Sequence, residues 1–205
     1  MDINKIKPIP KYILAAIKKK YGKPRKTEIV EKVEVSLPKE DIFFENYNCR
    51  LILTKGGYFK KISMQSARAT TEQKLKEGDF VIYEEDTDNR SEVLFFTDKG
   101  KVHHRKGYQI PEAGRTARGT AMVNVLPLEP GETVTAMVVT REFHEDEFLM
   151  MVTKKGTVKR IPFIALKTNR KTGIRAITLD ENDHLINVIR TCGSDNIVIA
   201  TAGGM

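Results

Sequence analysis

The fold is decided by one stretch of sequence that occurs four times: RLILTKGGYFKKI (50–62), VLFFTDKGKVHHR (93–105), FLMMVTKKGTVKRIP (148–162) and IVIATAGGM (197–205). In each copy an apolar run leads to a threonine, and a glycine follows three residues later. The threonines are Thr54, Thr97, Thr153 and Thr201, which lie 43, 56 and 48 residues apart. A glycine supplies the positive φ that a tight hairpin turn requires, so we predict four β-hairpins at regular intervals.

A second element recurs between these hairpins, as LKEGDFVIY (75–83), LEPGETVTAMVV (128–139) and LDENDHLINVI (179–189). Each unit therefore contains a hairpin, an acidic turn and a further strand. The length of such a unit is that of one propeller blade. A single blade cannot bury both of its faces, so neighbouring units must stack. We predict a mainly β, propeller-like domain of about three blades plus the start of a fourth. An ordinary antiparallel barrel or sandwich, with the likeness between units due to chance, stays open as the alternative.

The first 40 residues differ from the rest. Residues 9–21 have apolar side chains at helical spacing, and Gly22 and Pro24 end the pattern, so we predict one helix there. Residues 33–37 alternate as a strand or extended connector does. We place the boundary between this helix with its connector (1–40) and the β domain (41–205). Because the sequence ends inside the expected fourth turn, we expect a fragment of a longer protein.

The net charge of +8 points to a polyanionic partner. Residues 1–40 hold 11 Lys or Arg against 5 Asp or Glu, whereas residues 41–205 hold 24 against 22. Within the β domain the charges are sorted along the chain: residues 154–175 hold eight basic residues and no acid. A basic track of this kind binds phosphates and releases their counterions, although each single lysine on its own is more often only solvated.

The sequence argues against several other classes of protein. It contains no phosphate-binding loop, no nucleophile elbow and no acidic cluster typical of a magnesium site, which disfavours a free-standing enzyme. Cys49 and Cys192 are far apart, so we expect reduced thiols and neither a disulfide nor a metal site. His103 and His104 are adjacent and point to opposite faces of a strand, which disfavours a shared metal. The absence of a signal peptide and of a long apolar run predicts a cytoplasmic protein without a membrane partner.

The stretch GRTARGTAMVNVLPLEPGETVTAMV (114–138), together with the hairpins, resembles the C-terminal domain of the A subunits of bacterial type IIA topoisomerases, DNA gyrase and topoisomerase IV. The segment KKYGKPRKTEIV (19–30) resembles the connector that leaves the breakage-reunion domain of these subunits. The resemblance covers nearly the whole chain.

This resemblance implies a β-pinwheel, a propeller-like disc whose basic outer rim bends double-stranded DNA. It also implies that the parent protein works in the bacterial cytoplasm, at the nucleoid, with a second A subunit, together with an ATPase B subunit. The catalytic tyrosine and the use of ATP and Mg²⁺ would lie elsewhere in that enzyme, so we expect this fragment to be non-catalytic alone and to hold no cofactor. A propeller-type protein-interaction module without a nucleic-acid role is the alternative.

One motif of the family is missing. The gyrase hallmark, Gln-Arg-Arg-Gly-Gly-Lys-Gly, belongs in the loop after the first hairpin, where this chain has QSARATTEQKLKEGD (65–79). That loop has neither the glycine pair nor the arginine pair. The departure favours a gyrase paralogue, a chain whose box follows Met205, or a topoisomerase IV-type subunit.

We predict that the basic side chains of the hairpins and the loops after them contact DNA phosphates. Arg115 and Arg118 are the best candidates, because Gly114 and Gly119 let the backbone approach closely and arginine suits phosphate. The full set is Lys55, Lys60, Lys61, Lys99, Lys101, Arg105, Lys106, Arg115, Arg118, Lys154, Lys155, Lys159, Arg160, Arg170, Lys171 and Arg175.

Overall fold

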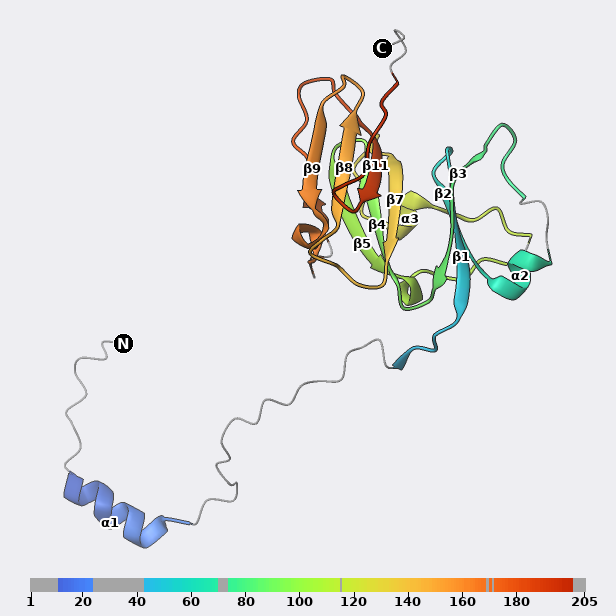
Figure 1. Cartoon of the computed structure of the whole chain (residues 1–205). Helices are drawn as coiled ribbons and strands as arrows, with labels where there is room; N and C mark the ends of the chain where they lie inside the picture. Colours follow the sequence, from blue (N-terminus) through green and yellow to red (C-terminus); the bar gives the residue numbers. More distant parts are fainter. Residues whose placement is uncertain are drawn as a thin grey trace. The chain divides into compact units, whose positions relative to one another are not determined.

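The computed structural model describes residues 11–23, 43–69, 74–114, 116–168, 170 and 172–200. The chain divides into two compact units, residues 1–38 and 39–205 (Figure 1). The described part of the first unit is α1 (Lys11–Tyr21), which confirms the predicted helix within the described residues. Three lysines occupy its last turn, where the helix dipole stabilises positive charge. None of the residues of α1 is buried. The strand predicted at 33–37 lies outside the described residues.

The second unit contains three antiparallel sheets, each built on one of the predicted hairpins. The first sheet has the order β3 (Val81–Asp88), β1 (Asn48–Thr54), β2 (Tyr58–Ser63), β6 (Thr120–Ala121). The second has the order β10 (Ile174–Arg175), β5 (Lys101–Lys106), β4 (Glu92–Thr97), β7 (Val134–Thr140). The third has the order β11 (Leu185–Thr191), β8 (Phe148–Thr153), β9 (Val158–Pro162). The short helices are α2 (Met64–Arg68), η3 (Gly107–Gln109), α3 (Met122–Val125) and η4 (Phe163–Leu166).

The first three hairpins form where the repeated stretch predicts them, as β1–β2, β4–β5 and β8–β9. Their turn glycines Gly57, Gly100 and Gly156 have φ values of +77°, +73° and +87°. The positive φ explains why each copy of the repeat has glycine there. The predicted fourth turn, with Thr201, lies outside the described residues, and residues 196–200 form no strand.

The sheets are interlocked by strands from the following repeat. In the first sheet β6 follows the second hairpin in sequence, yet it pairs with β2, with Phe59 opposite Thr120. In the second sheet β10 follows the third hairpin and pairs with β5, with Val102 opposite Ile174. Among the described residues β9 has no such neighbour and pairs only with β8.

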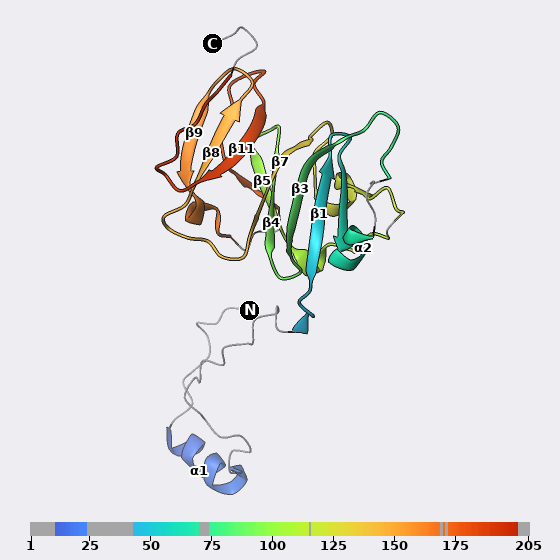
Figure 2. The ribbon, with the colours of Figure 1, turned by 45° about the vertical axis from the view of Figure 1, so that its right-hand side comes forward.

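The two edges of each sheet face different surroundings. At one edge lie β3, β7 and β11, and β7 contacts both of the others. Figure 2 shows β11, β7 and β3 between β9 on one side and β1 with α2 on the other. We call this the inner edge, and we call the opposite edge, at β6, β10 and β9, the outer edge. A groove where the inner strands meet is lined by residues that include Tyr83, Val139 and Ile189.

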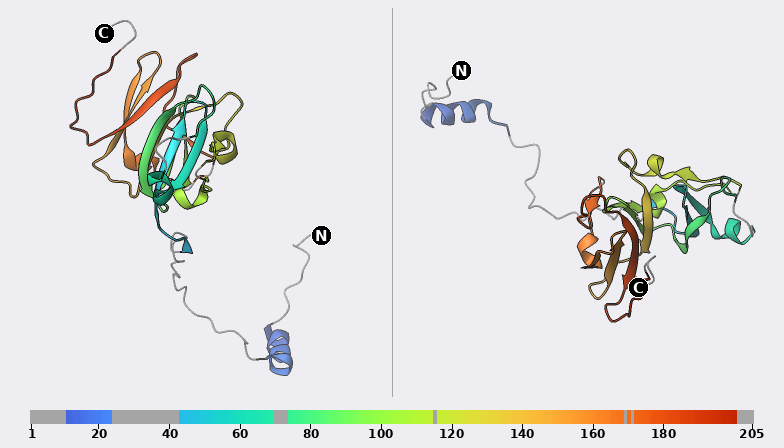
Figure 3. Two further views of the ribbon diagram at one scale, coloured as in Figure 1. Left: turned by 90° about the vertical axis from the view of Figure 1, so that its right-hand side faces the viewer. Right: turned by 90° about the horizontal axis from the view of Figure 1, so that it is seen from above.

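Two apolar clusters fill the spaces between the sheets. Phe59 of the first sheet and Phe95 of the second pack edge to face with ring centroids 5.2 Å apart. A second cluster joins the second and third sheets through Phe96, Leu149 and Phe163. Seen from above in Figure 3, the third sheet and the first lie on opposite sides of the second. The phenylalanines of β4 are therefore core residues, as their apolar surroundings in the sequence indicate.

Candidate nucleic-acid interface

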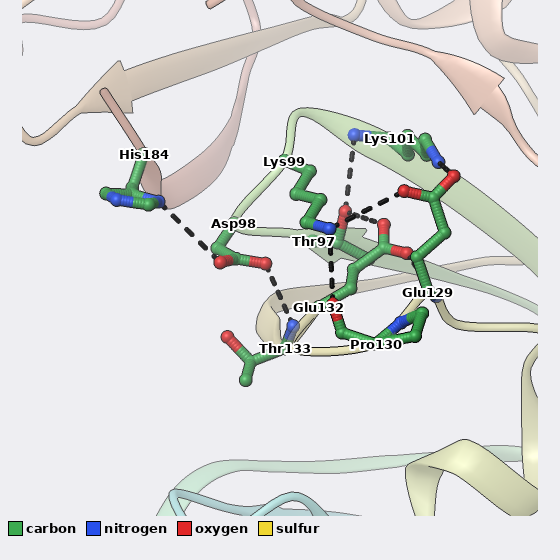
Figure 4. Close-up of polar contacts among 9 residues, drawn as sticks. All are labelled: Thr97, Asp98, Lys99, Lys101, Glu129, Pro130, Glu132, Thr133 and His184. Carbon is green, nitrogen blue, oxygen red and sulfur yellow. Dashed lines mark hydrogen bonds and ion pairs between the residues drawn. The ribbon is translucent and has the colours of Figure 1, made fainter. Parts of the chain in front are cut away.

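Each hairpin turn is held by an acid from the acidic turn that follows it. In the second repeat the Thr97 hydroxyl donates to a Glu132 oxygen at 2.7 Å, and both side chains are buried (Figure 4). The other Glu132 oxygen accepts from the Glu129 backbone N–H at 2.8 Å. The carboxylate thus joins the threonine of the hairpin to the backbone of the acidic turn.

The first and third repeats use an aspartate in the same place. The Gly56 N–H donates to Asp79 at 2.7 Å, and the Lys155 N–H donates to Asp183 at 3.0 Å. A hydrogen bond from Thr54 lowers the pKa of the Asp79 carboxyl, which keeps it charged and accepting. The acids that recur between the hairpins therefore hold the turns in place, and the turn tips are presented from fixed positions.

The turn tips carry exposed lysines. Lys55 and Lys154 are exposed at the tips of the first and third turns. Lys155 is also exposed, and its Nζ donates to the Glu181 carbonyl at 2.6 Å. These three predicted side chains lie at the surface.

In the second repeat the predicted lysines already have an anionic partner. Lys101 Nζ lies 2.5 Å from Glu129 Oε1, and Lys99 Nζ lies 3.5 Å from Glu129 Oε2 (Figure 4). The hydrogen bond from Lys101 lowers the pKa of the Glu129 carboxyl. Exposed ion pairs of this kind are weak, so both lysines stay among the candidate contacts.

Lys60 and Lys61 do not project to the surface where the prediction placed them. Each is 3% exposed on β2. Lys61 Nζ donates to Asn89 Oδ1 at 2.9 Å and to the Gly107 carbonyl at 2.8 Å, so it ties the first sheet to the turns beside it. We therefore leave both lysines out of the candidate interface.

Arg105 and Lys106 are half-buried and engaged within the protein. The Arg105 guanidinium donates to the carbonyls of Val125 and His104, at 3.2 and 2.9 Å. Lys106 Nζ lies 3.1 Å from Glu92. These two side chains position neighbouring segments, and phosphate contact would compete with those bonds.

The outer edge presents two cationic loops, residues 114–119 before β6 and residues 168–173 before β10. Arg118, Arg170 and Arg175 are exposed. Within the described part of the chain, no hydrogen bond or ion pair engages their side chains. Arg115 and Lys171, predicted in the same loops, lie outside the described residues. Lys167, which was not among the predicted contacts, is also exposed beside the second loop.

Lys159 and Arg160 of β9 are exposed. In the repeat they correspond to Lys60 with Lys61 and to His103 with His104, and all four of those side chains are buried. On β9 both side chains are exposed, and β9 has no further strand beside it among the described residues. Lys159 Nζ donates to the Ala176 carbonyl at 3.0 Å, and Arg160 lies over the Phe148 ring at 4.9 Å.

Charges of both signs lie at the inner edge. Glu84 and Asp86 of β3 pair with Arg50, Asp88 pairs with Arg141, and β11 carries Arg190. Elsewhere, at the turn tips and in the outer-edge loops, lie exposed cations whose side chains have no partner within the described part of the chain. Among the described residues no group of His, Cys, Asp or Glu could hold a metal ion. No described helix is long and apolar enough to cross a membrane.

Comparison with known proteins agrees with this geometry. Residues 91–141 and 147–192 match the family model for the DNA gyrase C-terminal domain, a β-propeller. The whole chain is 41% identical to the DNA gyrase A subunit of Clostridium acetobutylicum and covers 25% of it. Over 92% of its length the chain is 37% identical to the DNA gyrase A subunit of Streptococcus pyogenes serotype M3, of which it covers 24%. The chain thus spans about a quarter of the length of the curated relatives it matches.

The fold is shared with a solved domain. The C-terminal domain of DNA topoisomerase IV superposes with a TM-score of 0.66 at 23% identity, over 73% of this chain and 47% of that one. At this level of identity the likeness concerns the fold. It confirms the predicted β-pinwheel.

Proposed function

Residues 91–141 and 147–192 belong to the DNA gyrase C-terminal domain family, and from this premise we propose that the chain bends duplex DNA around its outer edge. The observation that carries the proposal is the exposure of Arg118 and Arg170 in the outer-edge loops and of Lys154 at a turn tip. Their side chains have no partner within the described residues, whereas Glu84, Asp86 and Asp88 of β3 at the inner edge are already paired with arginines. Phosphates carry no base identity, so the contacts are sequence-tolerant. Bending a duplex costs several kcal/mol by elastic estimates, and the bend is repaid by contacts spread over several sheets.

In the whole protein this part would steer strand passage by a type IIA topoisomerase and so control DNA topology. We propose that its partners are a second A subunit, together with an ATPase B subunit, in the bacterial cytoplasm at the nucleoid. ATP and Mg²⁺ would act on those other parts of the enzyme. The chain described here supplies the surface that DNA follows.

The resemblance leaves two kinds of topoisomerase subunit open. The curated relatives quoted above are gyrase A subunits, yet the loop at 65–79 lacks the glycine and arginine pairs of the gyrase box. We propose a gyrase-type subunit whose first repeat contributes less to wrapping than the box-bearing form would.

The test compares two double variants of equal charge change in the full chain. Arg118→Gln with Arg170→Gln removes outer-edge cations. Arg141→Gln with Arg190→Gln removes cations that line a second groove beside the inner strands, where they pair with Asp88 and Glu147. Binding of a fluorescent duplex is measured by anisotropy at several salt concentrations, and circular dichroism checks folding. The outer-edge variant should lower the slope of log K against log salt by about 1 to 2, because each lost phosphate contact removes about 0.9. The inner variant should keep the wild-type slope.

Wrapping is measured separately. Nicked circular plasmid is incubated with the chain, ligated and freed of protein, and a shift in linking number reports chiral wrapping. Salt-sensitive binding without a shift indicates bending without a chiral wrap. If the wild-type chain does not bind duplex even at low salt, the proposal fails and the protein-interaction module takes its place.

A further inference from the structure

The loop that carries Arg118 is fastened to the first sheet at both of its ends. Before the loop, the Ala113 N–H donates to the Lys61 carbonyl at 2.7 Å. After the loop, the Met122 N–H donates to the Gly57 carbonyl at 2.9 Å. The described residues of this loop, 114 and 116–118, therefore lie between two attachments to the first hairpin, although they belong to the repeat that forms the second sheet.

Gly119 lies where this loop meets β2. Its φ is +98°, and a Cβ added there would lie 2.7 Å from the Phe59 carbonyl oxygen. Phe59 pairs with Thr120. Alternate residues of a strand point their backbone groups to the same neighbour, and the Gly57 carbonyl, two residues before, accepts from Met122. The Phe59 carbonyl therefore also faces the added strand. Any side chain at position 119 would push β6 away from its partner.

The third repeat reproduces this arrangement on the second sheet. Gly173 has a φ of +80°, and a Cβ added there would lie 2.8 Å from the His103 ring and 3.1 Å from the Val102 carbonyl oxygen. Beyond it, the Ala176 N–H donates to the Gly100 carbonyl at 2.9 Å. The loop with Arg170 is therefore held on the preceding sheet at the end that leads into β10.

We propose that Gly119 and Gly173 are positioning residues for DNA binding, which seat the cationic loop of one repeat on the outer edge of the preceding sheet. This inference rests on the proposed function. Each cationic loop then depends on two repeats, one that supplies its sequence and one that supplies the edge under it. A duplex that follows the outer edge would meet arginines whose spacing is set by strand pairing.

The experiment is a double-mutant cycle in the full chain between Gly119→Ala and Arg118→Gln. Duplex affinity and its salt slope are measured by anisotropy, at a temperature where circular dichroism shows every variant folded. Gly131→Ala is the matched control, because Gly131 also has a positive φ (+75°) but a Cβ there would meet nothing within 4 Å. Hydrogen exchange at Thr120 and Ala121 reports whether β6 stays paired.

Gly119→Ala should weaken binding and lower the salt slope about as much as Arg118→Gln does, with faster exchange in β6. In the Gly119→Ala background, Arg118→Gln should then change the affinity less than about twofold, because the loop is already displaced. Gly131→Ala should keep the wild-type slope. If Gly119→Ala does not fold, Gly173→Ala with Arg170→Gln provides the same cycle.

Additive effects of the two substitutions, in a wild-type chain that binds duplex, would overturn the inference and leave the proposed function standing. A wild-type slope in Gly119→Ala would do the same. A wild-type chain that does not bind duplex at all would reject the proposed function, and this inference with it.

Discussion

Lysines of this chain have opposite roles according to where the fold places them. Lys61 is buried and donates to Asn89 and Gly107, so its charge stabilises contacts between segments of the protein. Lys154 is exposed at a turn tip. Removing a buried donor leaves its partners unsatisfied, whereas removing an exposed cation costs little stability.

We therefore expect Lys61→Met to lower the free energy of unfolding by roughly 1–3 kcal/mol, since two buried acceptors lose their donor. The DNA affinity of the folded variant should equal that of wild type. Lys154→Gln should show the reverse, with wild-type stability and weaker, less salt-sensitive binding. Urea unfolding and anisotropy measure the two quantities, and a DNA-binding defect in folded Lys61→Met would return Lys61 to the interface.

His103 makes stability depend on pH. It is 1% exposed, and neither ring nitrogen has a hydrogen-bond partner among the described residues. Burial lowers its pKa below the ordinary value of 6.5; Glu132 opposes this shift, and the cations Arg105 and Lys101 add to it. The unfolded chain therefore binds the proton first as the pH falls. Stability is full above about pH 6.5 and is lost as the pH falls toward the lowered pKa.

The check is urea unfolding between pH 7.5 and 5.5. Wild type should lose stability over this range by at most about 1.4 kcal/mol per pH unit from this group. His103→Leu should flatten the dependence, whereas His144→Gln, at an exposed histidine, should keep it. Identical pH dependence in wild type and His103→Leu would show that another group is responsible.

At the scale of elements, each of the three described hairpin turns is held by an acid from the acidic turn that follows it. The Thr97 hydroxyl and Glu132 are both buried, so Thr97→Val leaves a carboxylate oxygen without its donor. We expect a loss of about 1–3 kcal/mol in unfolding free energy, measured by urea denaturation. Thr133→Val is the control, because Thr133 is exposed and contributes only its backbone to the same turn. Equal losses in both variants would contradict a special role for the buried hydroxyl.

The elements that recur with a strong local pattern could be predicted from the sequence. The three described hairpins follow from an apolar run, a threonine and a glycine at fixed spacing. The bond between Thr97 and Glu132 could not be predicted, because its partners are 35 residues apart. The strands β6 and β10 have two residues each, too few for any periodicity, so their exchange between sheets appears only in three dimensions.

The exposure of the predicted contact residues could be foreseen only for those in turns and loops. Arg118, Arg170 and Lys154 lie in turns and loops, and the structure exposes them. In strands a basic residue has no local mark that separates a buried position from an exposed one, because burial depends on distant segments that pack over it, as Asn89 and Gly107 do on Lys61. Lys61 and Arg160 hold the same position of the repeat, yet only the first is covered.

At the scale of the molecule, the pairing of β6 and β10 with preceding sheets makes the first two sheets depend on the next repeat. The outer edges of these two sheets are closed by β6 and β10. The same pairing that completes the core also carries the cationic loops. Under the proposed function, stability and DNA binding should therefore respond together to anything that loosens the outer edge.

Hydrogen exchange tests this dependence directly. The Thr157 carbonyl accepts from the Thr153 N–H of the β8 end of the hairpin. Backbone groups of successive residues point to opposite sides of a strand, so the Val158 N–H faces the open edge of β9. The equivalent N–H groups of Val102 and Phe59 face β10 and β6. Val158 is 42% exposed, against 0% for Val102 and 2% for Phe59. We expect the Val158 amide to exchange at least roughly tenfold faster than the other two. Leu149, in the central strand β8, is the internal control and should exchange slowly. Slow exchange at Val158 would mean that its edge is covered in solution, which would contradict the idea that each outer edge needs a strand from the following repeat.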